Sequence, residues 1–251
     1  MGLKLIYISS SQRFNYNTTN SNNFNISCAD SLYGSYRLKA ISLPNTIYTV
    51  DSGINNTFYM SITAGPSNVL ITVPNSYLTD GTTLATVIQT AINTNATIAA
   101  SGVVFTVGYD IVTSKLTITN NTNPFQLDLS NNYLAPINSI IGFSYGVYNS
   151  NTAVAPYSIT SNQIVNLTRT PSIFITIQEA NNYLQNVNTG MRYTFMIPNN
   201  VNSLYFIDSF FDQTGIFNQF AKELSITLRD DQNRIVDIQN VDWYMVLESI
   251  C

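Results

Sequence analysis

Hydrophobic and polar positions alternate along much of this chain, in short runs separated by turns rich in Asn, Ser and Gly. Alternation with a period of two residues is typical of strands that bury one face. The pattern predicts strands at 3–10, 24–29, 36–50, 57–63, 69–73, 164–168, 172–178, 192–197, 203–208 and 224–228. No repeat of roughly 20–50 residues is visible, which disfavours propellers and solenoids.

The segment YRLKAISLPNTIYTV, residues 36–50, breaks its own alternation. Its first apolar residues alternate with Arg37 and Lys39, so one face is apolar and the other is charged. Ile41 then falls on the charged face, and Pro44 follows. Because proline cannot donate to a sheet ladder, it belongs at an edge, a strand end or a bulge. We therefore expect one long strand that bends at Pro44 and resumes directly after it.

One helix is predicted at residues 81–93. Its apolar positions are spaced as one face of a helix, namely Leu84, Val87, Ile88, Ala91 and Ile92. Asp80 or Thr79 can cap its first turn. A hairpin is predicted at 103–119, and residues 211–223 are expected to form a loop with one helical turn.

The C-terminal region has the clearest strand pattern. Residues 224–228 alternate, RDDQNR makes a turn, and Trp243, Met245 and Leu247 then alternate with polar or exposed positions. This pattern predicts a β-hairpin or meander with one buried face. Trp243 is expected in the core rather than as a platform for stacking sugars, because it shares a face with two other apolar residues.

The balance of elements indicates fold class. One medium helix among many strands favours an all-β antiparallel sandwich with a small α/β insertion near the middle. The length of 251 residues suits one large all-β domain or two small ones, with enough chain for a real core.

Charge narrows the range of partners. Charged residues make up only 10% of the chain, against about 25% in ordinary soluble domains, so the surface favours packing against neighbours. The net charge is −4, and the first 25 residues carry only Lys4 and Arg13 as bases. No basic arm is available to neutralise phosphates, so we expect no direct nucleic-acid binding. No stretch approaches the roughly 20 apolar residues of a membrane span.

The chemistry of the side chains argues against catalysis. The chain contains no histidine, which removes Ser-His-Asp and Cys-His nucleophilic pairs and His-containing metal sites. Glycine-rich phosphate-binding motifs are absent as well. Cys28 and Cys251 are expected to be reduced thiols, although a disulfide between them is left open. We therefore predict no enzyme activity, no catalytic, metal or cofactor-binding residues, and no cofactor.

Carboxylates are the remaining generic catalytic option. Asp208 with Asp212, and Asp230 with Asp231, are the closest pairs considered. Glycosidase chemistry needs two facing carboxylates about 5–9 Å apart, which a sequence does not show. For Asp230 and Asp231 a solvated hairpin turn is the favoured interpretation.

The basic pair of the broken strand has two interpretations. Arg37 and Lys39 could bind an anionic partner or a sugar acid. An exposed strand face without such a partner is the favoured interpretation.

Four stretches, taken in order, resemble the penton, or minor capsid, proteins of virophages, Polinton-like viruses and related eukaryotic double-stranded DNA viruses. The first is YRLKAISLPNTIYTV. The second joins TTLATVIQTAI to FTVGYDIVTSKLTIT and IIGF. The third is IVNLTRTPSIFITI, and the last is LSITLRDDQNRIVDIQNVDWYMVLES. The resemblance covers most of the chain.

This resemblance implies a single jelly roll that forms a homopentamer at the fivefold vertices of a virion, assembled inside the infected host cell. Its neighbours would be a double jelly-roll major capsid protein. The jelly roll is expected at 1–60 plus 155–251, with the α/β insertion at 61–154. The resemblance carries over no catalytic residue, and it leaves open the role of the insertion, the virus and the host.

Two alternative functions stay open at this point. A viral fibre or receptor- or glycan-binding jelly-roll module would also suit an Asn-rich and aromatic surface. An enzyme acting on polysaccharides ranks third. Oligomeric state separates the first two, because a pentamer indicates a vertex and a trimer indicates a fibre.

Overall fold

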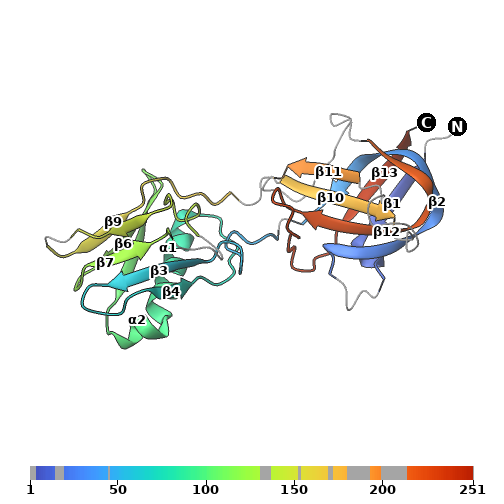
Figure 1. The fold of residues 1–251 in the computed structure, drawn as a ribbon. Coiled ribbons are helices and arrows are strands. Elements are labelled where there is room, and N and C mark those ends of the chain that lie inside the picture. The colour runs from blue at the N-terminus through green and yellow to red at the C-terminus, as the bar shows by residue number, and fades with distance from the viewer. Residues whose placement is uncertain are drawn as a thin grey trace. The chain divides into compact units, whose positions relative to one another are not determined.

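The chain folds into two compact units in this computed structural model (Figure 1). Unit 1 joins Met1–Ile47 to Arg169–Cys251, and unit 2 is Tyr48–Thr168. The described residues are 4–14, 20–44, 46–130, 137–151, 154–168, 172–179, 193–198 and 214–250. The units divide at 47/48 and 168/169, whereas the sequence placed the boundaries at 60/61 and 154/155. The difference arises because the strands at 57–62 and 157–160 pair only with strands of unit 2.

Unit 1 is built from antiparallel strands, which confirms the predicted fold class. A short 3₁₀ turn (Ser10–Gln12) follows the first strand. The strands are β1 (Leu5–Ser9), β2 (Asn23–Ser42), β10 (Ser172–Glu179), β11 (Tyr193–Pro198), β12 (Thr214–Arg229) and β13 (Tyr244–Ile250). Their hydrogen-bonded order is β1-β13-β2-β12-β10-β11.

Two long strands, β2 and β12, each serve two layers. Residues 35–42 of β2 pair with β13, whereas residues 23–27 pair with the end of β12. The start of β12 pairs with residues 34–37 of β2, and its end also pairs with β10. The layers are therefore β1-β13-β2-β12 and β2-β12-β10-β11, which is the strand pairing of a jelly roll.

The two long strands change layer at irregular points. Gly34 of β2 has a φ of 98°, a left-handed conformation that a residue with a Cβ adopts only with strain. Opposite it, the pairing between β2 and β12 shifts register twice, between Phe217 and Ala221 and between Ala221 and Glu223. Such irregularities bend a strand and increase its twist, so they let one strand continue from one layer into the next.

The prediction of one strand across 36–50 is wrong. β2 begins at Asn23, which joins two predicted strands into one, and it ends at Ser42, before Pro44. Between Pro44 and Val50 the described residues hold one bridge, from Val50 to Ser76 of unit 2. Pro44 therefore follows the end of a strand and bends none, as expected for a residue that cannot donate to a ladder.

A β-bulge explains the change of alternation in this segment. Val246 pairs with Ala40, and the next residue of β13, Leu247, pairs with Leu38, so Lys39 is an extra residue. One extra residue exchanges the faces of all that follow. Leu38 before the bulge and Ile41 after it are consequently both buried in the core.

Three further expectations are corrected, one at the end of unit 2 and two in unit 1. Residues 164–168 form no strand, and residues 214–223 are strand rather than a loop with a helical turn. β12 and β13 do not form the predicted hairpin, because each pairs with other strands and only Arg229 bridges to Ile235 in the connection. The predicted strand 203–208 lies outside the described residues.

The described residues of unit 2 form two helices and two small antiparallel sheets, with strand orders β4-β3-β7-β8 and β5-β6-β9. The predicted hairpin is confirmed as β5 and β6. The elements are β3 (Thr57–Ile62), β4 (Val69–Thr72), α1 (Gly81–Thr94), α2 (Ala96–Ala100), β5 (Phe105–Asp110), β6 (Lys115–Asn120), β7 (Phe125–Asp128), β8 (Val147–Asn149) and β9 (Tyr157–Thr160).

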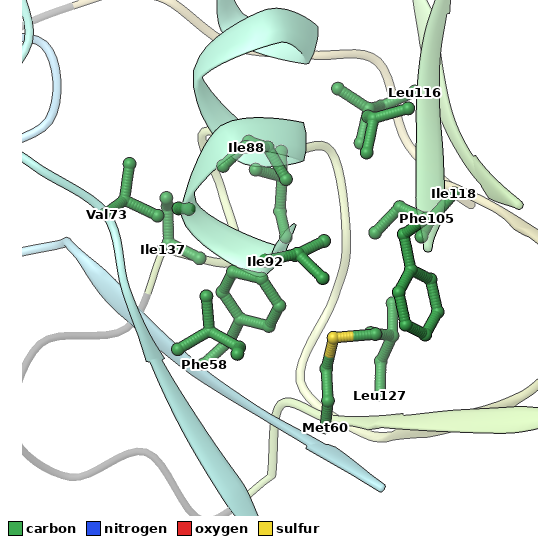
Figure 2. Packing of buried hydrophobic residues seen from close by; sticks show 14 of the residues in the cluster. Phe58, Met60, Val73, Ile88, Ile92, Phe105, Leu116, Ile118, Leu127 and Ile137 are labelled. Carbon is green, nitrogen blue, oxygen red and sulfur yellow. The ribbon is translucent and has the colours of Figure 1, made fainter. Parts of the chain in front are cut away.

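The helix α1 is confirmed, together with its cap. Asp80 is the N-cap residue, and its carboxylate accepts a hydrogen bond of 2.8 Å from the Thr83 backbone N–H. This bond lowers the pKa of the Asp80 carboxyl below its ordinary value, because it favours the charged form. Ile88 and Ile92 project from the helix into a cluster that includes Phe58 (Figure 2). Unit 2 therefore has a hydrophobic core of its own.

The core of unit 1 gathers side chains from both layers of the jelly roll. Trp243, Met245 and Leu247 are all buried in it, as predicted. Trp243 meets Phe24 edge to face, with ring centroids 5.9 Å apart, and its indole N–H donates to the Ser21 carbonyl over 2.6 Å. A large aromatic side chain with a satisfied N–H is thus central to this core.

We expect Trp243→Ala to destabilise unit 1 by about 3–5 kcal/mol, because it leaves a large cavity in a closed core. Urea unfolding monitored by circular dichroism measures this loss. The matched control is Ile235→Ala, whose side chain is 44% exposed and which should cost less than about 0.5 kcal/mol. Equal midpoints for the tryptophan variant and the wild type would contradict the described packing.

Deletion of Lys39 should be tolerated, because it removes the extra residue of the bulge and leaves Leu38 and Ile41 on the core face. The matched control is deletion of Ser225, which lies in regular pairing between Leu224 and Ile226. That deletion turns buried aliphatic side chains toward solvent, and each side chain so exposed should cost about 1.5–3 kcal/mol of stability. Thermal unfolding compares the two deletion variants. Equal destabilisation would refute the bulge as the cause of the change of alternation.

Candidate functional site

The outer face of unit 1 is defined here as the side of β1, β13 and β2 that points away from the core. Strand register arranges this face in rows. One row runs Leu5–Glu248–Arg37, and the next runs from Tyr7 through Val246 to Ala40. Ser9, Tyr244 and Ser42 form a third row.

A buried carboxylate holds the middle of the first row. Glu248 is only 3% exposed. It accepts a hydrogen bond of 2.5 Å from Arg37 Nε, and Lys39 Nζ lies 3.8 Å from the same oxygen. The bulge therefore has a second effect, since it leaves Lys39 within reach of a carboxylate that Arg37 already engages.

The arrangement adds an internal partner to the favoured view of the basic pair as an outward strand face. Arg37 and Lys39 are not simply an exposed strand face, because both contact Glu248 within the same chain. The Arg37 and Lys39 side chains remain 34% and 40% exposed. An internal carboxylate already balances one of the two charges, which weakens the case for an anionic ligand here.

Apolar and aromatic side chains surround this ion cluster on the outer face. Tyr7 is 71% exposed, Tyr244 is 45% exposed, and Leu5 is 40% exposed. Val246 between them is buried. Exposed apolar residues that are contiguous, rather than scattered, mark surfaces that another protein covers. Tyrosine beside a charged rim is also the composition of protein interfaces.

β1 is also an open edge of the sheet within the described residues. Ser249 donates to the Lys4 carbonyl and Ser10 donates to the Trp243 carbonyl, so Leu5 and Tyr7 direct their backbone groups away from β13. A groove of about 520 Å³ lies beside this edge and is lined in part by Ile26 and Leu32 of the core. No proline or charge interrupts the strand itself, so the edge is not protected against pairing.

Cys28 is the one cysteine among the described residues. Cys28 is a free, half-buried thiol in this groove. Burial raises the pKa of its thiol, an effect that the nearby Lys4 partly opposes. Less of the reactive thiolate is therefore present at neutral pH. Cys251 lies outside the described residues, so the pairing of the two cysteines stays open.

The predicted turn at Asp230 and Asp231 is partly corrected. Asp230 is buried rather than solvated, and its carboxylate accepts hydrogen bonds from the backbones of Gln232 and Arg234. Arg234 Nε also donates to it over 2.6 Å. Asp231 is exposed as expected. Asp230 therefore organises the turn, while Asp208 and Asp212 lie outside the described residues.

A buried arginine was missed by sequence reasoning. The Arg13 side chain is fully buried and bridges to Asp242 over 2.6 Å, while also donating to Asn240. It joins the turn after β1 to the residues before β13. A lone basic residue in a polar segment gives no signal of such a contact, because Asp242 and Asn240 lie more than 200 residues along the chain.

The described ranges contain no cluster of three or more His, Cys, Asp or Glu residues suited to hold a metal ion. In the same ranges, no helix combines the length and hydrophobicity needed to cross a bilayer. The outer face of unit 1 is accordingly the strongest candidate site in that unit.

Comparison with known proteins gives distant likenesses among solved structures alone. No family model matches this chain, and no curated protein matches it either. Among solved structures, the selenomethionine-labelled mavirus penton protein aligns over 99% of both chains with 10% sequence identity and a TM-score of 0.47. A likeness at this level carries no argument about family or function, and the jelly roll rests on the strand pairing described above.

We expect Arg37→Leu to destabilise unit 1 more than Glu248→Gln. Removing Arg37 leaves the buried Glu248 carboxylate without its nearest partner, which should lower the free energy of unfolding by about 1–3 kcal/mol. In Glu248→Gln, by contrast, the Arg37 side chain can turn toward water. Chemical denaturation of the two variants measures the difference. Equal losses, or a larger loss for Glu248→Gln, would contradict the asymmetry of burial.

Proposed function

We propose that this chain is a structural capsid protein, the pentameric vertex capsomer of an icosahedral double-stranded DNA virus, and that it has no enzyme activity. A jelly roll alone decides no function, because the fold serves many. The observation that carries the proposal is the exposed apolar face of β1 and β13, with Tyr7, Tyr244 and Leu5 beside an open sheet edge. Such a face suits permanent contact with other subunits better than free diffusion.

Composition supports the same role. With 10% charged residues and no histidine, the chain offers few groups for acid–base chemistry and little charge to keep molecules apart. The resemblance of its four sequence stretches to penton proteins agrees with this use of a jelly roll. It also names the partners in the proposal, which are four further copies and a double jelly-roll major capsid protein.

Fivefold assembly makes a specific demand on the surface. Each subunit must offer two different faces, and the ring closes only at the right angle. The outer face of β1 and β13 is one such face in this proposal. Its contacts are mainly apolar, so raising salt to about 1 M, where the screening length is about 3 Å, should not dissociate the ring.

The test is the mass of the purified chain in solution, measured by analytical ultracentrifugation at low and high salt. We expect a pentamer that Tyr7→Asp converts to monomers, because it places a charge in an apolar contact. The matched control is Tyr77→Asp, a 43% exposed tyrosine of unit 2, which should leave the pentamer intact.

Other outcomes of this measurement have clear meanings. A stable trimer would favour the alternative of a fibre or attachment module. A chain that stays monomeric at high concentration, or a pentamer that Tyr7→Asp does not disturb, would contradict the proposed face.

A further inference from the structure

A small polar pocket lies on unit 2, at one end of the sheet β4-β3-β7-β8. It has a volume of about 220 Å³, enough for one ring-sized ligand rather than a drug-sized molecule. Three neighbouring strands supply its polar side chains, since Ser61 of β3 pairs with Gln126 of β7, which pairs with Asn149 of β8. Thr63 and Pro124 complete one side.

The hydrogen bonds inside this pocket leave a defined set of groups for a ligand. Gln126 donates from its amide nitrogen to the Asn149 side-chain oxygen over 2.8 Å. The Gln126 oxygen remains as an acceptor and the Asn149 nitrogen as a donor, and exchanging O and N in both amides leaves one of each as well. Ser61 Oγ already accepts from the Asn68 backbone N–H, so its hydroxyl proton is left to donate.

The charge of the site selects against ionic ligands. None of the described residues that line the pocket is charged. Asp128 is the nearest acid along β7, two residues from Gln126 on the same face of the sheet. Its carboxylate repels anions, while the pocket itself offers no carboxylate or arginine to bind a cation or a phosphate.

An aromatic ring stands in the adjoining row of the same sheet face. Tyr59 pairs with Asp128 and precedes Ser61 by two residues, so the two side chains share a face. The ring is half-buried, with Leu70 across from it on β4. Tyr59 itself is outside the lining, in which Ile62, Pro124 and Phe125 supply the apolar surface beside the polar groups.

We propose that this pocket binds one ring of a neutral carbohydrate, a ligand that goes beyond the capsid role proposed above. Adjacent hydroxyl groups of a sugar each donate and accept, which matches the alternating Ser61 hydroxyl, Gln126 oxygen and Asn149 amide. The apolar C–H face of the ring then lies toward Pro124, which lines the pocket. A glycan on a surface that the virus contacts is the source to which the proposal commits.

A peptide is a poorer fit to this position. Extended peptides bind by adding to a strand edge, whereas Gln126 lies on β7, an inner strand paired on both sides. Nucleic acid is disfavoured by the absence of basic residues in the lining.

The test uses the full chain on an array of neutral, sialylated and sulfated glycans, followed by saturation-transfer NMR with glucose, galactose, mannose and N-acetylglucosamine. We expect saturable binding of at least one neutral sugar. Gln126→Ala and Asn149→Ala should each weaken it by about tenfold or more, the factor for about 1.4 kcal/mol of lost interaction. Ser61→Ala is a third variant in case one of these fails to fold.

The matched control is Thr72→Ala, an exposed residue of β4 on the same face but outside the lining, which should bind as the wild type does. The proposal is overturned if no neutral sugar binds, if sialylated or sulfated glycans bind better, or if the pocket variants bind unchanged. Subunit assembly is measured separately, so failure here leaves the capsid proposal standing.

Discussion

The pairing of β2 with β12 is the constraint on which the rest of unit 1 depends. These strands pair near Gly34 and again between residues 23–27 and 223–227, with register shifts between the two stretches. Because each strand belongs to both layers, neither layer can form without the other. This pairing closes the core between the layers, which contains Trp243. It also fixes the position of β13, which pairs with β2 and forms part of the outer face.

The chain enters unit 2 after β2 and returns before β10, so the insertion interrupts the jelly roll only between two strands. Unit 2 has its own core and its own sheets. A connection that leaves the strand pairing untouched lets an inserted domain change without disturbing unit 1. This separation is why we assign assembly to unit 1 and ligand binding to unit 2.

Local patterns in the sequence were sufficient where neighbours along the chain decide the structure. The face of α1, its Asp80 cap and the buried alternation of Trp243, Met245 and Leu247 all follow from residues a few positions apart. Contacts between distant segments could not be predicted in this way. The bulge at Lys39 depends on register with β13, more than 200 residues away.

The candidate site follows the same division. Alternation alone places Glu248 on the outward face, as if solvated, because its neighbour Leu247 points inward. Its burial arises from Arg37 across the strand and from the bulge that brings Lys39 near. Likewise, the row of Ser61, Gln126 and Asn149 comes from three separate strands. No spacing in the sequence predicts the ion cluster around Glu248 or this polar row.

The location of the chain in purified virions tests the capsid assignment most directly. Cryo-electron microscopy of particles that carry it should show five copies of unit 1 around each fivefold vertex, with β1 and β13 facing a neighbouring subunit. Density for the chain away from the vertices, or in a trimeric spike, would contradict this account.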